Sequence, residues 1–121
     1  MLSMRKPLIA FVVLASGGGA LTTSLATAAP SQRTVKVGDN WFLKNSGGTP
    51  KITVSRNTTV RFVFVGDSVH DVVGYRGSAK KFESSIKSSG SYRKKLTTSG
   101  TYKLVCSIHG AADQSMRIVV K

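Results

Sequence analysis

One cysteine and two histidines are the residues of this 121-residue sequence whose types and spacing could do chemistry. Cys106 and His109 are separated by two residues, and the segment after them holds Gln114 and Met116. His70 is the other histidine. Because a single cysteine cannot form an intramolecular disulfide, its thiol is a small buried hydrophobe, a nucleophile or a metal ligand.

The spacing predicts that these side chains lie near one point. Strand alternation turns Cys106 and Gln114 inward at the ends of two successive strands, and the short loop between them keeps His109 close. His70 also follows a predicted strand end. A thiolate and two imidazoles in a trigonal arrangement, with a weak axial ligand, suit copper that shuttles between its two oxidation states, although zinc accepts similar ligands. A Cys/His pair can also be a catalytic nucleophile and base, but no orienting acid is evident beside it.

The elements that must position these residues are short strands. Apolar and polar residues alternate with period two in several segments, and turn-forming residues separate them. This pattern predicts an all-β sandwich or barrel. Segment 74–86 is the least regular part and is predicted to be a loop or one short helix. The predicted strands contain residues 52–54, 60–64, 92–96, 102–106 and 116–120.

The N-terminal segment has the pattern of a cleaved secretory signal peptide. Arg5 and Lys6 precede an apolar run over 8–15, and Ala26-Thr27-Ala28 fits an A-x-A cleavage site. The apolar run is far shorter than the roughly 20 residues that span a bilayer. We therefore expect a signal peptide over 1–28, one domain over 29–121, no integral membrane segment after cleavage, and export to the periplasm or the cell exterior.

The composition is strongly basic. The sequence has 18 Lys and Arg against 5 Asp and Glu, a net charge of +13, and removal of the signal peptide leaves about +11. The small clusters at 80–81 and 93–95 are typical of solvated surface, and the aromatic residues fall on inward strand positions, which argues against nucleic-acid binding. A positive field instead steers acidic partners or attracts anionic membrane surfaces.

The motifs as a set resemble the cupredoxins, the plastocyanin and pseudoazurin kind of small blue copper protein. The resemblance covers nearly the whole chain after the signal peptide, and Cys-x-x-His alone would be a weak signal. The matching segments are Val35-Lys36-Val37, Val60 to Phe64, His70 with Val72 and Val73, Gly90 to Leu96, Gly100 to Tyr102, and Cys106 to His109.

The resemblance implies a Greek-key β-sandwich with one type 1 copper per chain, held by His70, Cys106 and His109. By the family's spacing after the second histidine, the resemblance implies Gln114 as the axial ligand, as in the stellacyanin branch, with Met116 as the alternative. The resemblance also pairs the residues that follow the first histidine and the cysteine, here Asp71 and Ser107, as a brace outside the ligands.

The function that the resemblance implies is that of a monomeric one-electron carrier and not an enzyme. Electrons would enter through the imidazole of His109. The basic charge predicts an acidic redox protein or a membrane redox enzyme as the partner. A copper-binding or delivery module that hands over its metal is the alternative.

Overall fold

A computed structural model describes residues 31–45, 48–77 and 79–121 of the chain. The predicted signal peptide and its cleavage site lie outside the described residues, so the boundary at residue 29 stays a prediction. In the described part of the chain, no helix is long and apolar enough to cross a bilayer.

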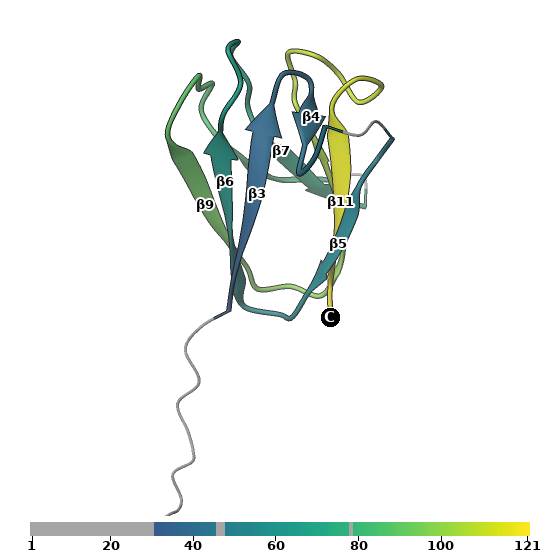
Figure 1. The fold of residues 1–121 in the computed structure, drawn as a ribbon. Helices are drawn as coiled ribbons and strands as arrows, with labels where there is room; N and C mark the ends of the chain where they lie inside the picture. Colours follow the sequence, from purple (N-terminus) through teal and green to yellow (C-terminus); the bar gives the residue numbers. More distant parts are fainter. Residues whose placement is uncertain (1–30, 46–47, 78) are drawn as a thin grey trace, which may run out of the picture.

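The described chain folds into two sheets that face each other (Figure 1). One sheet has the strand order β5-β11-β10-β7-β8 and the other has the order β4-β3-β6-β9. The β3/β6 and β11/β5 pairs are parallel, and the other pairs are antiparallel. The strands are β3 (Gln32–Gly38), β4 (Trp41–Phe42), β5 (Lys51–Val54), β6 (Thr58–Phe64), β7 (Val73–Arg76), β8 (Ala79–Glu83), β9 (Ser91–Leu96), β10 (Gly100–Val105) and β11 (Ser115–Val120).

Alternation along the strands fills the space between the sheets. In β6, Val60, Phe62 and Phe64 are buried while Arg61 and Val63 are partly exposed, which is the period of two that a half-buried strand requires. Burial of such side chains supplies most of the stability of a small domain. The predicted all-β sandwich is confirmed, and each predicted strand is present.

The prediction for segment 74–86 is wrong, because this segment forms the β7/β8 hairpin. The alternation is hidden in the sequence since Gly74 takes an inward position. A Cβ at Gly74 would lie 2.2 Å from the Phe82 ring, so the ring of the neighbouring strand fills the space that a Gly74 side chain would take. The register also shifts between Gly74 and Tyr75, and such a bulge interrupts the period of two.

The loops that carry the candidate ligands meet at one end of the sandwich, at the top of Figure 1. The candidate ligands lie in the loops after β6 and β10, and the loops after β3 and β8 reach the same end because all four strands run toward it. We call it the metal end. The strands thus hold the loops on a rigid base while the loops supply the polar chemistry.

We predict that Leu104→Ala lowers the free energy of unfolding by about 3 kcal/mol, because a fully buried leucine leaves a cavity that the packed core cannot close. Denaturant-induced unfolding measures the loss. Val65→Ala, at a side chain that is 48% exposed, is the control and should cost less than about 1 kcal/mol. Equal losses in the two variants would contradict this description of the core.

Candidate metal centre

A tight loop between β10 and β11 positions Cys106, His109 and Gln114. The N–H of Cys106 donates to the carbonyl of Gln114 (3.2 Å), which closes the loop at its base. Gly110 has a φ of +83°, a conformation that favours glycine. Its N–H donates to the Cys106 carbonyl (2.9 Å), and its own carbonyl accepts from the N–H of Gln114 (3.0 Å). The loop therefore brings the three side chains together through its own backbone.

His70 enters the same site from the loop after β6. Two backbone hydrogen bonds join it to Lys87. The His70 N–H donates to the Lys87 carbonyl (2.9 Å), and the Lys87 N–H donates to the His70 carbonyl (2.8 Å). Its side chain is fully buried, as is that of Cys106, whereas His109 is only partly buried. The two imidazole rings lie 4.8 Å apart between centroids.

The donor atoms of His70, Cys106 and His109 all lie within 4.8 Å of one another. Cys106 Sγ is 3.9 Å from His70 Nδ1 and 3.4 Å from His109 Nδ1. Nitrogen and sulfur ligands at about 2.0 and 2.3 Å from one ion, about 120° apart, are about 3.7 Å from each other. The three side chains therefore fit a single trigonally coordinated ion.

Gln114 presents its amide oxygen to this cluster. Gln114 Oε1 lies 2.9 Å from His70 Nδ1 and 3.1 Å from His109 Nδ1. Its amide nitrogen donates to the carbonyls of Gly38 (2.9 Å) and Trp41 (3.0 Å). Because these carbonyls only accept, the amide has one orientation, and the oxygen must face the cluster.

Met116 lies elsewhere. It is 1% exposed and belongs to the hydrophobic core cluster between the sheets. The structure thus brings Gln114 to the cluster and places Met116 among the packed apolar side chains.

Asp71 and Ser107 connect the two ligand loops. Asp71 is buried, and its carboxylate accepts hydrogen bonds from the Ser107 N–H (2.7 Å) and the Ser107 hydroxyl (2.5 Å). Since these residues directly follow His70 and Cys106, the paired hydrogen bonds fix the distance between the two ligand segments.

Asp39 is a site residue that the sequence analysis missed. His70 Nε2 donates to Asp39 Oδ1 at 2.9 Å. The carboxylate also accepts from Asp67 N–H (2.8 Å) and from the Ser68 N–H (3.1 Å) and hydroxyl (2.8 Å). A Cβ on Gly66 would lie 2.2 Å from Asp39 Oδ1, so glycine leaves the room that the carboxylate occupies.

The contact from Asp39 corrects the expectation that no orienting acid lies near the Cys/His pair. Metal-ligating histidines commonly donate their second ring N–H to a carboxylate. That general rule could have directed attention to the five acidic residues, but no sequence spacing relates Asp39 to His70. The Cys106 thiol is fully buried, whereas reactive catalytic cysteines are usually partly exposed.

The charge of Asp39 is strongly favoured in the folded chain. The hydrogen bond from His70, and then those from Asp67 and Ser68, hold the pKa of this carboxyl well below its usual range. A carboxyl with a lowered pKa stabilises the fold above the ordinary aspartate pKa of about 4, and this contribution is lost as the pH falls toward the pKa of the folded state.

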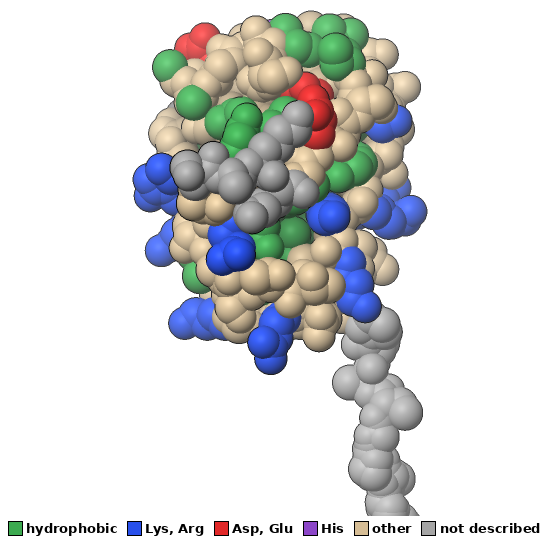
Figure 2. All heavy atoms as spheres, turned by 180° about the vertical axis from the view of Figure 1, so that it is seen from behind, with side chains coloured by type: hydrophobic (Ala, Val, Ile, Leu, Met, Phe, Trp, Pro, Cys, Tyr) green, Lys and Arg blue, Asp and Glu red, His purple; other side chains and the backbone are tan. Residues whose placement is uncertain are grey.

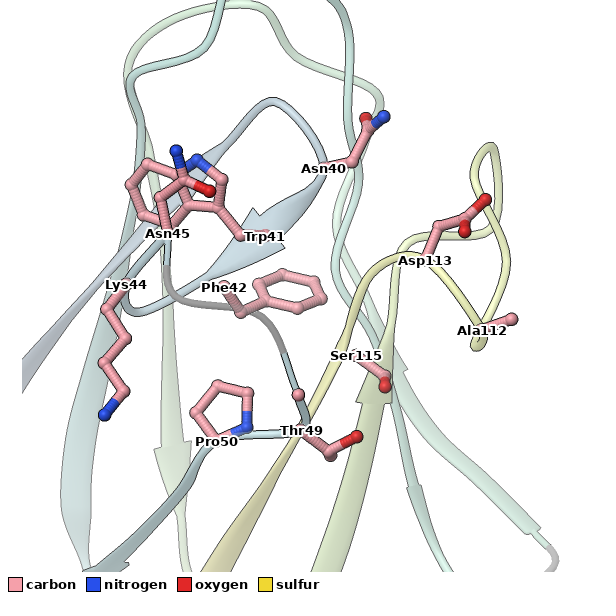
Figure 3. A pocket seen from close by; sticks show the side chains of 11 residues that line it. Asn40, Trp41, Phe42, Lys44, Asn45, Thr49, Pro50, Ala112, Asp113 and Ser115 are labelled. Atoms are coloured by element: carbon pink, nitrogen blue, oxygen red, sulfur yellow. The ribbon is translucent and has the colours of Figure 1, made fainter.

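A pocket of about 290 Å³ lies beside the metal end but does not contain the cluster (Figure 3). Trp41 and Lys44 lie on one side of it in this view and Asp113 and Ala112 on the other. None of the candidate ligand side chains lines this pocket. The candidate metal centre is instead a closed cluster of converging donor atoms.

No protein-family model matches the sequence, and no curated protein matches it significantly. Several solved structures are similar to the structure of this chain. Oxidized plastocyanin from Dryopteris crassirhizoma is 26% identical over 73% of this chain and 99% of its own, with a TM-score of 0.58. A methionine-to-glutamine mutant of amicyanin in its Cu(I) form is 22% identical over 75% of this chain and 83% of its own, with a TM-score of 0.59.

Dithionite-reduced auracyanin from the photosynthetic bacterium Roseiflexus castenholzii is 16% identical over 78% of this chain and 99% of its own, with a TM-score of 0.60. Each of these chains is matched over most of its length. The likeness confirms the fold and the resemblance that the sequence motifs indicated.

We predict that Asp39 sets the tautomer of His70 in the metal-free chain. Because a carboxylate only accepts, it holds the imidazole proton on Nε2 and leaves the Nδ1 lone pair toward Cys106 and Gln114. Imidazole ¹⁵N chemical shifts at mildly alkaline pH should report the Nε2–H form of His70.

Asp39→Ala should mix the two tautomers of His70, whereas Asp39→Asn retains an acceptor oxygen and should preserve the Nε2–H form. An unaltered His70 spectrum in Asp39→Ala would show that the carboxylate does not control the ring.

Proposed function

From the cupredoxin fold of this chain, we propose that it binds one copper ion as a type 1 centre and carries single electrons. One observation carries the proposal: a buried thiol, two imidazoles and an oriented amide oxygen converge at the metal end. This donor set suits copper in both oxidation states. The bound copper would supply the one-electron couple. The residues of the chain would hold the ligands in place and keep water from the ion.

The ligands would be His70 Nδ1, Cys106 Sγ and His109 Nδ1, with Gln114 Oε1 as the axial ligand. The contacts of Asp39, Asp71 and the loop backbone hold these groups in place without the ion. A site that keeps its shape when the charge of the ion changes needs little rearrangement during electron transfer, and burial keeps water from the ion.

His109 would connect the ion to the partner. It is the one partly exposed histidine of the cluster, and Gly110, Ala111 and Ala112 beside it are too small to keep a partner at a distance. Exposed apolar side chains also lie in the loops of the metal end, at Val65, Val69, Ile86 and Ile108. Such a surface permits close, short-lived contact.

We propose an acidic redox protein or a membrane redox enzyme as the partner, in line with the net positive charge. The chain would act after export, and it would bring about no chemical conversion of a substrate. Burial of His70, Cys106 and Gln114 favours a carrier over a copper-delivery module, because delivery requires that an acceptor reach the ligands and displace them.

Copper loading tests the proposal. We expect Cu(II) added to the metal-free chain to give an intense visible thiolate charge-transfer band and a type 1 EPR spectrum. Cys106→Ser should abolish both signals, whereas Ser115→Ala, on the exposed side of β11, should retain them. A colourless protein would contradict the proposal. Rapid passage of Cu(I) to an acceptor apoprotein would instead identify a delivery module.

We predict that Gln114→Met raises the reduction potential, because a hard amide oxygen favours Cu(II) more than a thioether does. The expected rise exceeds about 59 mV, which for a one-electron couple is a tenfold change in relative affinity for the two oxidation states. Spectroelectrochemical titration measures it.

Met116→Leu is the matched control, since it changes a neighbouring sulfur that packs in the core. Its potential should stay close to that of the unaltered chain. A large change in Met116→Leu together with none in Gln114→Met would make Met116 the axial ligand.

A further inference from the structure

Positive and negative side chains occupy different parts of this molecule. The five carboxylates all lie in the loops or strand ends of the metal end, at Asp39, Asp67, Asp71, Glu83 and Asp113. On the face seen in Figure 2, acidic side chains lie only in the upper half, and most Lys and Arg side chains lie around the middle and lower body. The positive charge of the chain is therefore carried by the sheets.

The outer face of the four-stranded sheet carries four cations. Val35, Val37, Val60 and Phe62 turn inward, so their neighbours along β3 and β6 turn outward. These outward residues pair in register with the outward residues of β9. We call the surface formed by Lys36, Arg61, Arg93 and Lys95 the cationic face.

Two arginines stand directly opposite each other on the cationic face. Arg61 pairs in register with Arg93 across the antiparallel β6/β9 ladder. Like charges at such positions destabilise a sheet, and no ion pair joins either arginine to a carboxylate among the described residues. The sheet keeps an unfavourable arrangement that an external anion would relieve.

Arg61 lies partly buried on this face, and its Nε is covered and has no hydrogen-bond acceptor among the described residues. An external phosphate could therefore bind this side chain only through the terminal nitrogens of the guanidinium, which suit phosphate or carboxylate oxygens. The hydroxyls of Thr34, Thr59 and Ser91 lie at outward positions of the same face and can donate to the same oxygens.

The kind of partner follows from what the cationic face does not offer. Protein interfaces depend on a few buried aromatic or aliphatic anchors. Among the outward positions of β3, β6 and β9, where the four cations lie, the one apolar side chain is the partly buried Val63. Trp41, on the edge strand β4, packs over Gly38 at the end of the same face. The exposed large hydrophobic side chains lie at the metal end instead. A bilayer of anionic lipids requires only a flat array of cations near its phosphates.

We propose that the cationic face binds the phosphate groups of an anionic bilayer surface. The sheet then lies flat on the membrane, and its strands run parallel to the surface. Because the carboxylates are confined to the metal end, that end is repelled by the headgroups and stays free along the membrane plane. Adsorption does not require the metal, whereas its use in presenting His109 to a membrane partner rests on the proposed function.

Flotation with lipid vesicles tests the proposal. The purified metal-free chain should float with vesicles of phosphatidylglycerol and phosphatidylcholine, and not with phosphatidylcholine alone. Each lost cation should lower the partition coefficient about fivefold, so Arg61→Gln/Arg93→Gln should lower it by more than about tenfold. All variants share the same N-terminus, so any contribution from residues 1–30 cancels in the comparison.

The matched control is Lys51→Gln/Lys103→Gln, which removes the same charge from the outer positions of β5 and β10 in the other sheet. It should lower the partition coefficient less than about fivefold. If the arginine variant does not fold, Lys36→Gln/Lys95→Gln replaces it, since both of these side chains are exposed. The partition coefficient of this variant should also fall by more than about tenfold.

Three results would overturn the proposal. Equal losses in the control and the cationic-face variants would show attraction by net charge alone. Absence of flotation with anionic vesicles would exclude the bilayer. If the unaltered chain bound soluble polyglutamate but no vesicles, and the arginine variant lost the polyglutamate binding, the face would be a docking site for an acidic protein. None of these results bears on copper binding, so failure here is distinguishable from failure of the proposed function.

Discussion

The arrangement of the metal end depends on the two hydrogen bonds that the Gln114 amide donates to the Gly38 and Trp41 carbonyls. Gln114 precedes β11 of the five-stranded sheet, whereas the two carbonyls belong to the β3/β4 turn of the other sheet. One side chain thus joins the two sheets at the end where the ligands converge. The same turn carries Asp39, so the contact that orients the Gln114 oxygen also fixes the carboxylate that holds His70.

Converging acceptors are unfavourable without a cation, and the surroundings of the site show how the fold keeps them together. The Asp39 carboxylate contacts His70 Nε2 and so leaves Nδ1 facing inward, the fixed amide directs an oxygen inward, and a thiol lies beside both imidazoles. These groups would separate if they were on mobile loops. The hydrogen bonds between Asp71 and Ser107 and the closed β10/β11 loop resist this separation. Folding itself therefore provides the free energy that brings the groups of the site together before an ion binds.

The cluster of candidate ligands could be predicted because their chemistry is rare in this sequence and because each lies near a strand end. The choice between Gln114 and Met116 could not be made from strand alternation, since both face inward. It depends on the donors of the amide, which only the position of the β3/β4 turn reveals. Asp39 was missed for a related reason: the parallel β3/β6 pairing, with Val37 opposite Phe64, brings two loops together that are far apart in the sequence.

Strand prediction failed where packing replaced alternation. At Gly74 the apolar group that fills the inward position belongs to Phe82 on the neighbouring strand, so the sequence of β7 alone carries no sign of it.

The distribution of charge over the surface also could not be predicted from the sequence. Composition gives the net charge, which sets the attraction felt at long range, but it cannot give the separation of carboxylates from cations. That separation follows from topology: loops and strand ends at one end carry the acids, and most of the bases lie in the strands. A partner that approaches the metal end therefore meets the least positive part of a basic protein, so charge alone could not hold the proposed redox partner there. Close contact at His109 must come from the small and apolar side chains around it.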